Sequence, residues 1–173
     1  MSAVEESAAA APRHPFAAAI SNRDHGAVVD TLAPDVVLHA AVTATPFEGQ
    51  DTVAELYASV IDAFEYVQVI DEFEAPDAYA FFWRGRMDGR FVEGADRLRL
   101  DAEGKVREIT VVGRPLSGLA AFLTGIGARF ARRRRGNLVA TILRLTVLPL
   151  APLFTLLDPL TRWLIGPSAR AEG

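Results

Sequence analysis

The chain has 173 residues, half of them hydrophobic, so it can bury one core and still has length for an appendage. It contains no cysteine, which excludes disulfides, thiolate catalysis and cysteine-based metal sites and is typical of a reducing cytoplasm. The net charge of −4 gives no general reason to expect nucleic-acid binding. It combines −11 through Gly113 (9 Lys and Arg, 20 Asp and Glu) with +7 from Arg114 onward (9 Arg, 2 acidic residues).

Residues 1–14 form an acidic, alanine-rich segment. They have no apolar run flanked by basic residues, so they do not resemble a secretory signal, and we expect a disordered leader. Hydrophobic residues then recur at helical spacing. This spacing predicts two short helices, over Pro15–Asn22 and Asp24–Leu32, with Asp24 as the N-cap of the second.

The next segment alternates between turns and regular structure. We expect a turn at Ala33–Asp35, a β-strand over Val36–Val42 and a loop at Thr45–Gly49. Residues 50–64 then carry apolar side chains at i, i+3, i+4 and i+7. They give the clearest amphipathic helix of the chain.

Four β-rich runs follow this helix, over Tyr66–Phe73, Ala78–Met87, Arg90–Leu100 and Val106–Arg114. Tight turns at Asp88-Gly89 and at residues 101–104 join the last three runs. The order predicts an α+β fold with a curved, mostly antiparallel sheet and the helices on one side. Helices cannot fully fill the concave face of such a sheet, so we expect a pocket there.

Four sequence phrases resemble the SnoaL-like branch of the NTF2-like superfamily. They are Leu32–His39 (LAPDVVLH), Pro46–Val53 (PFEGQDTV), Gly94–Leu100 (GADRLRL) and Gly104–Ile109 (GKVREI). The resemblance implies an NTF2-like domain over residues 15–115, shaped as a cone around an apolar pocket, and it implies a homodimer. The superfamily contains isomerases, cyclases, dehydratases and non-catalytic binders, so the fold alone does not decide the activity.

Ketosteroid isomerase, a member of this superfamily, offers a test of catalytic residues. That enzyme uses an aspartate base, together with a tyrosine and a protonated aspartic acid that donate hydrogen bonds to the enolate oxygen. By resemblance, Ala40 occupies the position of the base and Phe16 the position of the tyrosine. Alanine cannot accept a proton, and phenylalanine has no hydroxyl group to donate. Asp96 matches the aspartic acid, and Tyr57 matches a tyrosine that supports the network. Classical ketosteroid isomerisation is therefore not expected.

Epoxide hydrolysis is also disfavoured. That chemistry needs a carboxylate on the last strand to activate water. The corresponding run, Ile109–Gly113, contains none.

Asp96 is the strongest candidate for a functional side chain. If it shares the inward face of its strand with Leu98, burial raises its pKa, and the carboxyl can then act as a hydrogen-bond donor or general acid. The structural alternative is a buried carboxyl bonded to Tyr57 or to backbone. His39 is the candidate base, although simple alternation places it opposite Ala40 unless a bulge re-aims it.

We expect a hydrophobic pocket wall with contributions from both helices and strands. Its predicted ligand-binding residues are Phe16, Ile20, Tyr57, Trp83, Leu98, Ile109 and Val111. For Trp83 and Tyr57, packing in the core is the alternative to ligand contact. No metal or cofactor is expected, because Asp71, Glu72 and Glu74 are typical of a solvated strand edge and no phosphate-binding loop or metal-binding histidine pair occurs.

Residues 116–173 form an apolar, basic extension that we expect to be helical. Leu116–Phe130 is apolar, a run of arginines follows (Arg132, Arg133, Arg134 and Arg135), and Leu138–Leu157 is apolar over twenty residues. Arg144 and two prolines argue against a membrane-spanning helix. Two alternatives stay open: contact of the arginines and Trp163 with a membrane surface, or packing on the protein's own domain or a partner.

The leading functional hypothesis is a small-molecule-binding protein, whose hydrophobic ligand directs a carbonyl or hydroxyl group at Asp96. One alternative is an enzyme of the isomerase, cyclase or dehydratase type that uses Asp96 and His39 as acid and base. Another is an interaction module docked by its C-terminal extension. The expected location is the cytoplasm, at the inner face of the membrane if the extension binds lipid. A nucleic-acid partner is not expected.

Overall fold

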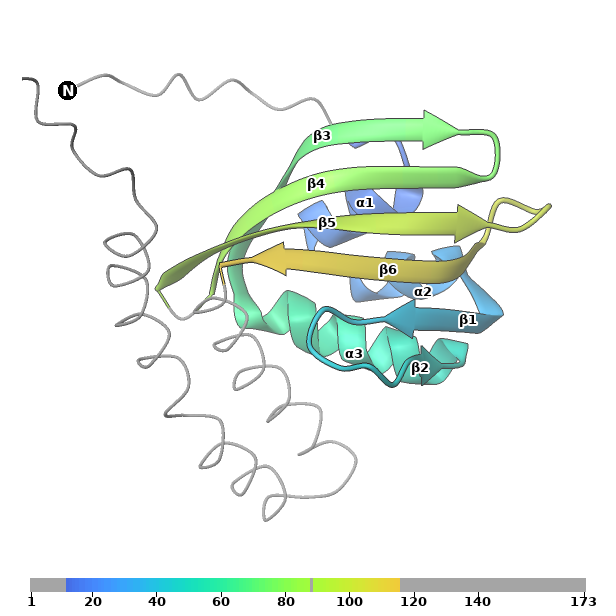
Figure 1. The fold of residues 1–173 in the computed structure, drawn as a ribbon, viewed down its shortest axis with the longest axis horizontal. Coiled ribbons are helices and arrows are strands. Elements are labelled where there is room, and N and C mark those ends of the chain that lie inside the picture. Colours follow the sequence, from blue (N-terminus) through green and yellow to red (C-terminus); the bar gives the residue numbers. More distant parts are fainter. Residues whose placement is uncertain (1–11, 88, 116–173) are drawn as a thin grey trace, which may run out of the picture.

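The computed structural model describes residues 12–87 and 89–115, and these residues form a curved sheet with helices on one side (Figure 1). The helices are α1 Pro15–Asn22, α2 His25–Thr31 and α3 Gln50–Ala63. The strands are β1 Leu32–His39, β2 Phe47–Glu48, β3 Phe64–Ala75, β4 Ala78–Met87, β5 Arg90–Leu100 and β6 Val106–Arg114. The predicted α+β architecture is confirmed. The predicted boundaries of α1, β4, β5 and β6 match those observed.

Within the described residues, the sheet has six strands in the order β2-β1-β6-β5-β4-β3. Strands β3 to β6 form an antiparallel meander, whereas β1 pairs with β6 in parallel, with Leu38 opposite Ile109. Strand β1 thereby brings the N-terminal part of the chain beside its last described strand. The pairing closes one side of the cone over α3.

Two local predictions were wrong. The turn expected at Ala33–Asp35 lies inside β1, where the register with β6 shifts between Leu32 and Val37. This irregularity accommodates Pro34, which has no N–H to donate to a regular ladder. The loop expected at Thr45–Gly49 contains β2, which pairs with Val37 and Leu38.

Other boundaries shift by a few residues. The strand predicted over Val36–Val42 ends at His39, and β3 extends beyond Tyr66–Phe73 at both ends. The Asp88-Gly89 connection is confirmed by the pairing of Met87 with Arg90. Gly89 has φ of 73°, a backbone conformation that favours glycine.

The core fills the space between the concave face of the sheet and the helices. Its largest side chains are fully buried and come from helices and strands alike, among them Phe16, Phe81, Leu98 and Ile109. Phe81, Leu98 and Ile109 are inward residues of β4, β5 and β6, and Leu98 and Ile109 face each other in the register. Strand alternation therefore supplies one half of the core, and the apolar sides of the helices supply the other.

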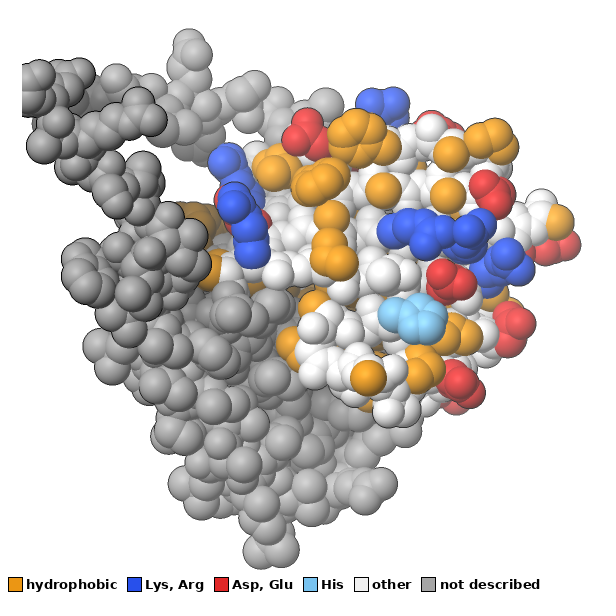
Figure 2. All heavy atoms as spheres, viewed as in Figure 1, with side chains coloured by type: hydrophobic (Ala, Val, Ile, Leu, Met, Phe, Trp, Pro, Cys, Tyr) orange, Lys and Arg blue, Asp and Glu red, His pale blue; other side chains and the backbone are white. Residues whose placement is uncertain are grey.

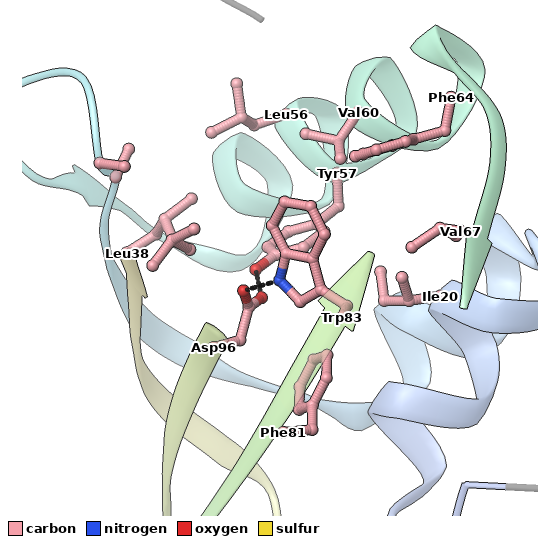
Figure 3. A pocket seen from close by; sticks show the side chains of 13 residues that line it. Ile20, Leu38, Leu56, Tyr57, Val60, Phe64, Val67, Phe81, Trp83 and Asp96 are labelled. Atoms are coloured by element: carbon pink, nitrogen blue, oxygen red, sulfur yellow. Dashed lines mark hydrogen bonds between the residues drawn. The ribbon is translucent and has the colours of Figure 1, made fainter. Parts of the chain in front are cut away.

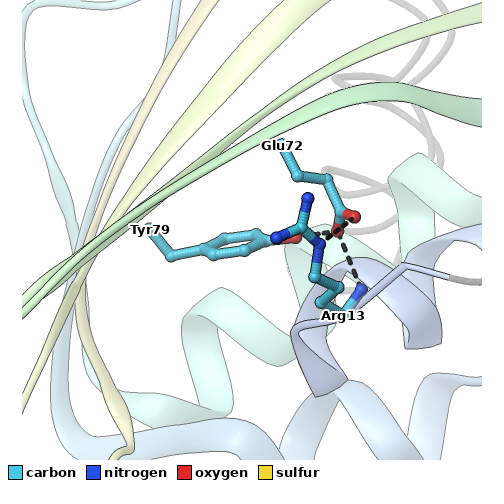
Figure 4. A network of polar contacts seen from close by, with 3 residues as sticks. All are labelled: Arg13, Glu72 and Tyr79. Atoms are coloured by element: carbon cyan, nitrogen blue, oxygen red, sulfur yellow. Dashed lines mark hydrogen bonds and ion pairs between the residues drawn. The ribbon is translucent and has the colours of Figure 1, made fainter.

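The start of α1 is fixed by His14, which is the N-cap residue of this helix. Its Nδ1 accepts the N–H of Phe16 at 3.1 Å, and its ring lies 4.8 Å from that of Tyr79. Figure 4 shows the neighbouring contacts, in which the Tyr79 hydroxyl and the Arg13 backbone N–H both donate to the Glu72 carboxylate. These contacts attach the segment before α1 to the sheet, at β3 and β4.

Acidification should loosen this attachment through His14. The cap needs a neutral Nδ1, and burial lowers the pKa of His14 from its ordinary value of 6.5 although Glu74 and Glu72 act to raise it. A base with a lowered folded-state pKa stabilises the protein above the unfolded pKa, and this stability is lost as pH falls below about 6.5. We expect His14→Ala to cost about 1 kcal/mol at pH 7.5 in urea unfolding.

His14→Asn is the matched control, because asparagine caps helices without titrating. It should unfold like the wild type at pH 7.5 and become the more stable of the two at pH 5. Identical pH dependence of the wild type and His14→Asn would contradict the role given to His14.

Candidate functional site

An apolar cavity lies between the concave face of the sheet and α3 (Figure 3). Its volume is about 50 Å³. The wall consists of Ile20, Leu38, Ala40, Ala41, Leu56, Tyr57, Val60, Phe64, Val67, Phe81, Trp83, Asp96 and Val111. Leu38, Phe81 and Asp96 are buried, whereas Ala41 is exposed and Val60 and Val67 are partly exposed. The cavity thus has a closed inner end at the sheet and a rim near α3 and β3.

Asp96 is the charged residue of this wall, and it is only 4% exposed. Its Oδ2 accepts the Tyr57 hydroxyl at 2.9 Å, and its Oδ1 accepts the Trp83 indole N–H at 2.8 Å. Figure 3 shows both donors directed at the carboxyl group, one from α3 and one from β4. Each carboxyl oxygen has one protein donor and keeps a further lone pair for a second.

The strand register explains why these groups meet. Asp96 on β5 faces Phe81 on β4, so both side chains point to the concave side. Trp83 comes two residues later on β4 and faces Gly94. A Cβ on Gly94 would lie 2.5 Å from the Val112 carbonyl oxygen and closer still to the indole Cζ2. The missing side chain of Gly94 is therefore what lets the indole lie across β5 and reach Asp96.

Burial controls the charge of the site. It raises the pKa of Asp96 to about 6, although the hydrogen bonds from Trp83 and Tyr57 lower it. The pKa of Tyr57 lies well above 10, because of burial first and the nearby Asp96 second. At neutral pH Asp96 is therefore mainly an acceptor. Below about pH 6 it gains a proton that it can donate to a carbonyl oxygen.

Five predicted site residues share this cavity: Ile20, Tyr57, Trp83, Asp96 and Val111. The other three predicted ligand-binding residues, Phe16, Leu98 and Ile109, are completely buried in the core and do not line it. Phe16 instead supports the wall, because its ring packs edge-on against Tyr57 at 5.0 Å. The phenylalanine at the isomerase tyrosine position thus has a structural role here.

His39 lies outside the cavity. Leu38 and Ala40 on either side of it line the wall, so alternation turns His39 to the opposite face of the sheet, where it is exposed. The register shift in β1 comes before Val37 and does not re-aim it. The structure therefore does not bring His39 to Asp96. Among the described residues that line the cavity, Asp96 and Tyr57 are the titratable ones.

Sequence reasoning missed most of the rim. Val60 and Phe64 lie three and seven residues after Tyr57, so helical periodicity contained a signal for both. Ala40 had a signal of another kind, its match to the base position of ketosteroid isomerase, whereas Ala41 had none. The predicted contact residues Arg132 to Arg135 and Trp163 lie outside the described residues.

Metal ligands do not converge in the part of the chain that the structure describes, where no group of three His, Asp or Glu side chains could hold an ion. The carboxylate of Glu72 is engaged by Arg13 and Tyr79. In the same part of the chain, no helix has the length and hydrophobicity needed to cross a membrane.

Raising the pH from 4 to neutrality should destabilise the native state through Asp96. A carboxyl whose pKa rises from 3.8 to about 6 on folding stabilises the protein fully below pH 3.8, and this contribution is lost as pH rises through 6. The loss is roughly 3 kcal/mol. Asp96→Asn removes the titrating group. Measured by urea unfolding, its free energy of unfolding relative to the wild type should therefore rise from pH 4 to pH 8.

The exposed variant Asp35→Asn serves as the control and should follow the wild type at both pH values. A constant stability difference between the wild type and Asp96→Asn from pH 4 to pH 8 would show that Asp96 is not desolvated as described.

Gly94→Ala should displace the Trp83 indole and break its bond to Asp96. Overpacking of this kind costs about 1–3 kcal/mol in the free energy of unfolding. The neighbouring Ala95 points to the other face of the sheet, so Ala95→Ser should hardly change the free energy of unfolding. In a Trp83→Leu background the added methyl group should cost less, and an undiminished cost would rule out a steric conflict with the indole.

Comparison with known proteins places this geometry in a family. A family model described as a SnoaL-like domain matches residues 14–109, which is more than half of the chain. No curated protein matches.

Solved structures share the fold. A steroid delta-isomerase from Pseudomonas aeruginosa is 25% identical with a TM-score of 0.60, covering 70% of this chain and 87% of its own. An uncharacterised protein with a cystatin-like fold from Silicibacter pomeroyi is 21% identical with a TM-score of 0.63, covering 68% and 86%. An NTF2-like protein from Mesorhizobium loti is 20% identical with a TM-score of 0.51, covering 56% and 83%. The chain belongs to the SnoaL-like domain family and has the NTF2-like fold.

Proposed function

We propose that this protein binds a small hydrophobic molecule whose single hydroxyl or carbonyl group contacts Asp96. The observation that carries the proposal is a buried carboxyl group in an otherwise apolar cavity wall. Burying a charge is costly, and Tyr57 and Trp83 compensate Asp96 with one hydrogen bond to each oxygen. A ligand hydroxyl would add a further donor to the carboxylate.

The size of the cavity limits which part of the ligand enters without rearrangement. A volume of about 50 Å³ holds a polar head group or a water molecule, whereas sites for drug-sized ligands have roughly 300–1,000 Å³. The partly exposed side chains Val60 and Val67 form the rim. A ring-sized ligand would move them outward, while its polar group stays at Asp96.

Similarity to a steroid delta-isomerase supports an apolar, ring-containing ligand. Proton transfer between carbon atoms is less well supported, because Ala40 lines the cavity at the place that the resemblance assigns to the base. The acid–base alternative needs His39, which is exposed on the opposite face. Binding is therefore proposed in preference to isomerisation.

Phenol and toluene test the directed contact, because they have nearly the same shape and differ in one hydroxyl group. A hydrogen bond to a charged carboxylate favours phenol by about tenfold in Kd or more. We expect the wild type at pH 7.5 to bind phenol more tightly in calorimetry and to show the larger rise in Tm. In Asp96→Leu the preference should disappear.

His39→Ala is the control and should keep the wild-type preference, since His39 lies outside the cavity. Equal Tm shifts by the two compounds in both the wild type and Asp96→Leu would contradict the proposed hydrogen bond between the ligand hydroxyl and Asp96. Isomerisation of a steroid that is lost in both Asp96→Leu and His39→Ala would instead restore the acid–base alternative.

A further inference from the structure

The outer face of the sheet carries a continuous apolar stripe, whose residues do not line the cavity. Phe82, Ala95 and Val112 are direct register partners on β4, β5 and β6. Ile70 and Phe73 extend the stripe onto β3, and the Phe73 ring packs edge-on against Phe82 at 6.0 Å. Figure 2 shows hydrophobic side chains across the middle of this face, with basic side chains on either side.

The stripe is strongly exposed. Phe73 is 60% exposed, Val112 57%, Phe82 45% and Ile70 44%. Between Ile70, Phe82 and Val112 lies a groove of about 470 Å³ with Ala95 in its lining, and the Glu93–Arg114 ion pair stands at its end. A contiguous apolar patch on a protein surface marks a site of interaction.

The chain itself supplies a matching segment. Residues 116–130 follow directly after Pro115, and their large apolar residues are Leu116, Leu119, Phe122, Leu123, Ile126 and Phe130. Five of these, all but Phe122, are spaced 3, 4, 3 and 4 residues apart. That spacing predicts a helix with a single apolar face, which needs a surface to cover.

Position and length also match. Strand β6 ends at Arg114, which lines the groove two residues after Val112. The stripe crosses four strands, so its width is about 15 Å from β6 to β3 at roughly 4.8 Å per strand. A helix of fifteen residues is about 22 Å long, which is enough to cross it. Attachment to β6 also gives the segment a local concentration in the millimolar range.

We propose that residues 116–130 form a helix that packs its apolar face across the outer stripe of Ile70, Phe73, Phe82, Ala95 and Val112. The extension then covers the side of the sheet opposite the ligand cavity. The proposal does not depend on the function proposed for Asp96.

Disulfide trapping in the full chain tests it, because the sequence contains no native cysteine. Ala95 lies in the middle of the stripe, and Ala120 follows Leu116 by four residues, so Ala95→Cys with Ala120→Cys keeps all the apolar contacts. The control pairs Ala120→Cys with Ala102→Cys, an exposed alanine in the β5–β6 turn, seven residues or roughly 23 Å from Ala95 along the sheet. Both pairs are oxidised at low protein concentration and separated on non-reducing gels.

The expected result is a monomer that cross-links about tenfold faster through Ala95→Cys than through the control pair. Equal rates for the two pairs, or no cross-link through Ala95→Cys, would overturn the proposal. Disulfide-linked dimers without cross-linked monomers would overturn it in favour of a second copy on the stripe. The reduced variants should unfold like the wild type, because Ala95 and Ala102 are not part of the buried core.

Discussion

The arrangement of the site depends on one buried carboxylate. Asp96 stands at the centre of β5 and accepts one donor from α3 and one from β4, so a single side chain connects the sheet to the helix above it. Without both donors, the cost of desolvating the charge would be uncompensated, and the group would stay protonated over a wider pH range. The same bonds hold Tyr57 and Trp83 in place as the polar and aromatic parts of the wall. The structural role of Asp96 and its proposed role in ligand binding therefore coincide, so variants at this position need a readout of binding as well as of stability.

Small residues are as important for the site as large ones. Gly94 leaves room for the indole over β5, and Ala40 and Ala41 leave the rim open where larger side chains would fill it. Phe16 shows the opposite case, since its large ring packs edge-on against Tyr57 and supports the cavity wall. The balance of small and large side chains gives a cavity of about 50 Å³. It also explains why a protein with the fold of a steroid isomerase has a smaller cavity than a steroid would need without rearrangement.

Most of the fold could be predicted from the sequence, because the regular elements have strong local signals. Alternation gave the bounds of β4, β5 and β6, and helical spacing gave those of α1. The errors occurred at Ala33–Asp35 and Thr45–Gly49, where proline and glycine indicate turns locally but pairing with neighbouring strands makes short β-structure. In the site, Asp96, Tyr57 and Trp83 were predicted as separate residues. Their mutual hydrogen bonds, and the exposure of His39, depend on the register between strands and on where β1 shifts, which a single sequence does not determine.

The parallel pairing of β1 with β6 affects how the protein acquires its shape during synthesis. Val37 and Leu38 find their partners Glu108 and Ile109 about seventy residues later in the chain, so this contact has a high sequence separation. While the ribosome is still adding the meander, β1 can pair with β2 but has an open edge where β6 will lie. An open edge on a nascent chain is where non-native strand pairing begins. The cavity, which takes wall residues from both β1 and β6, is therefore among the last features to form.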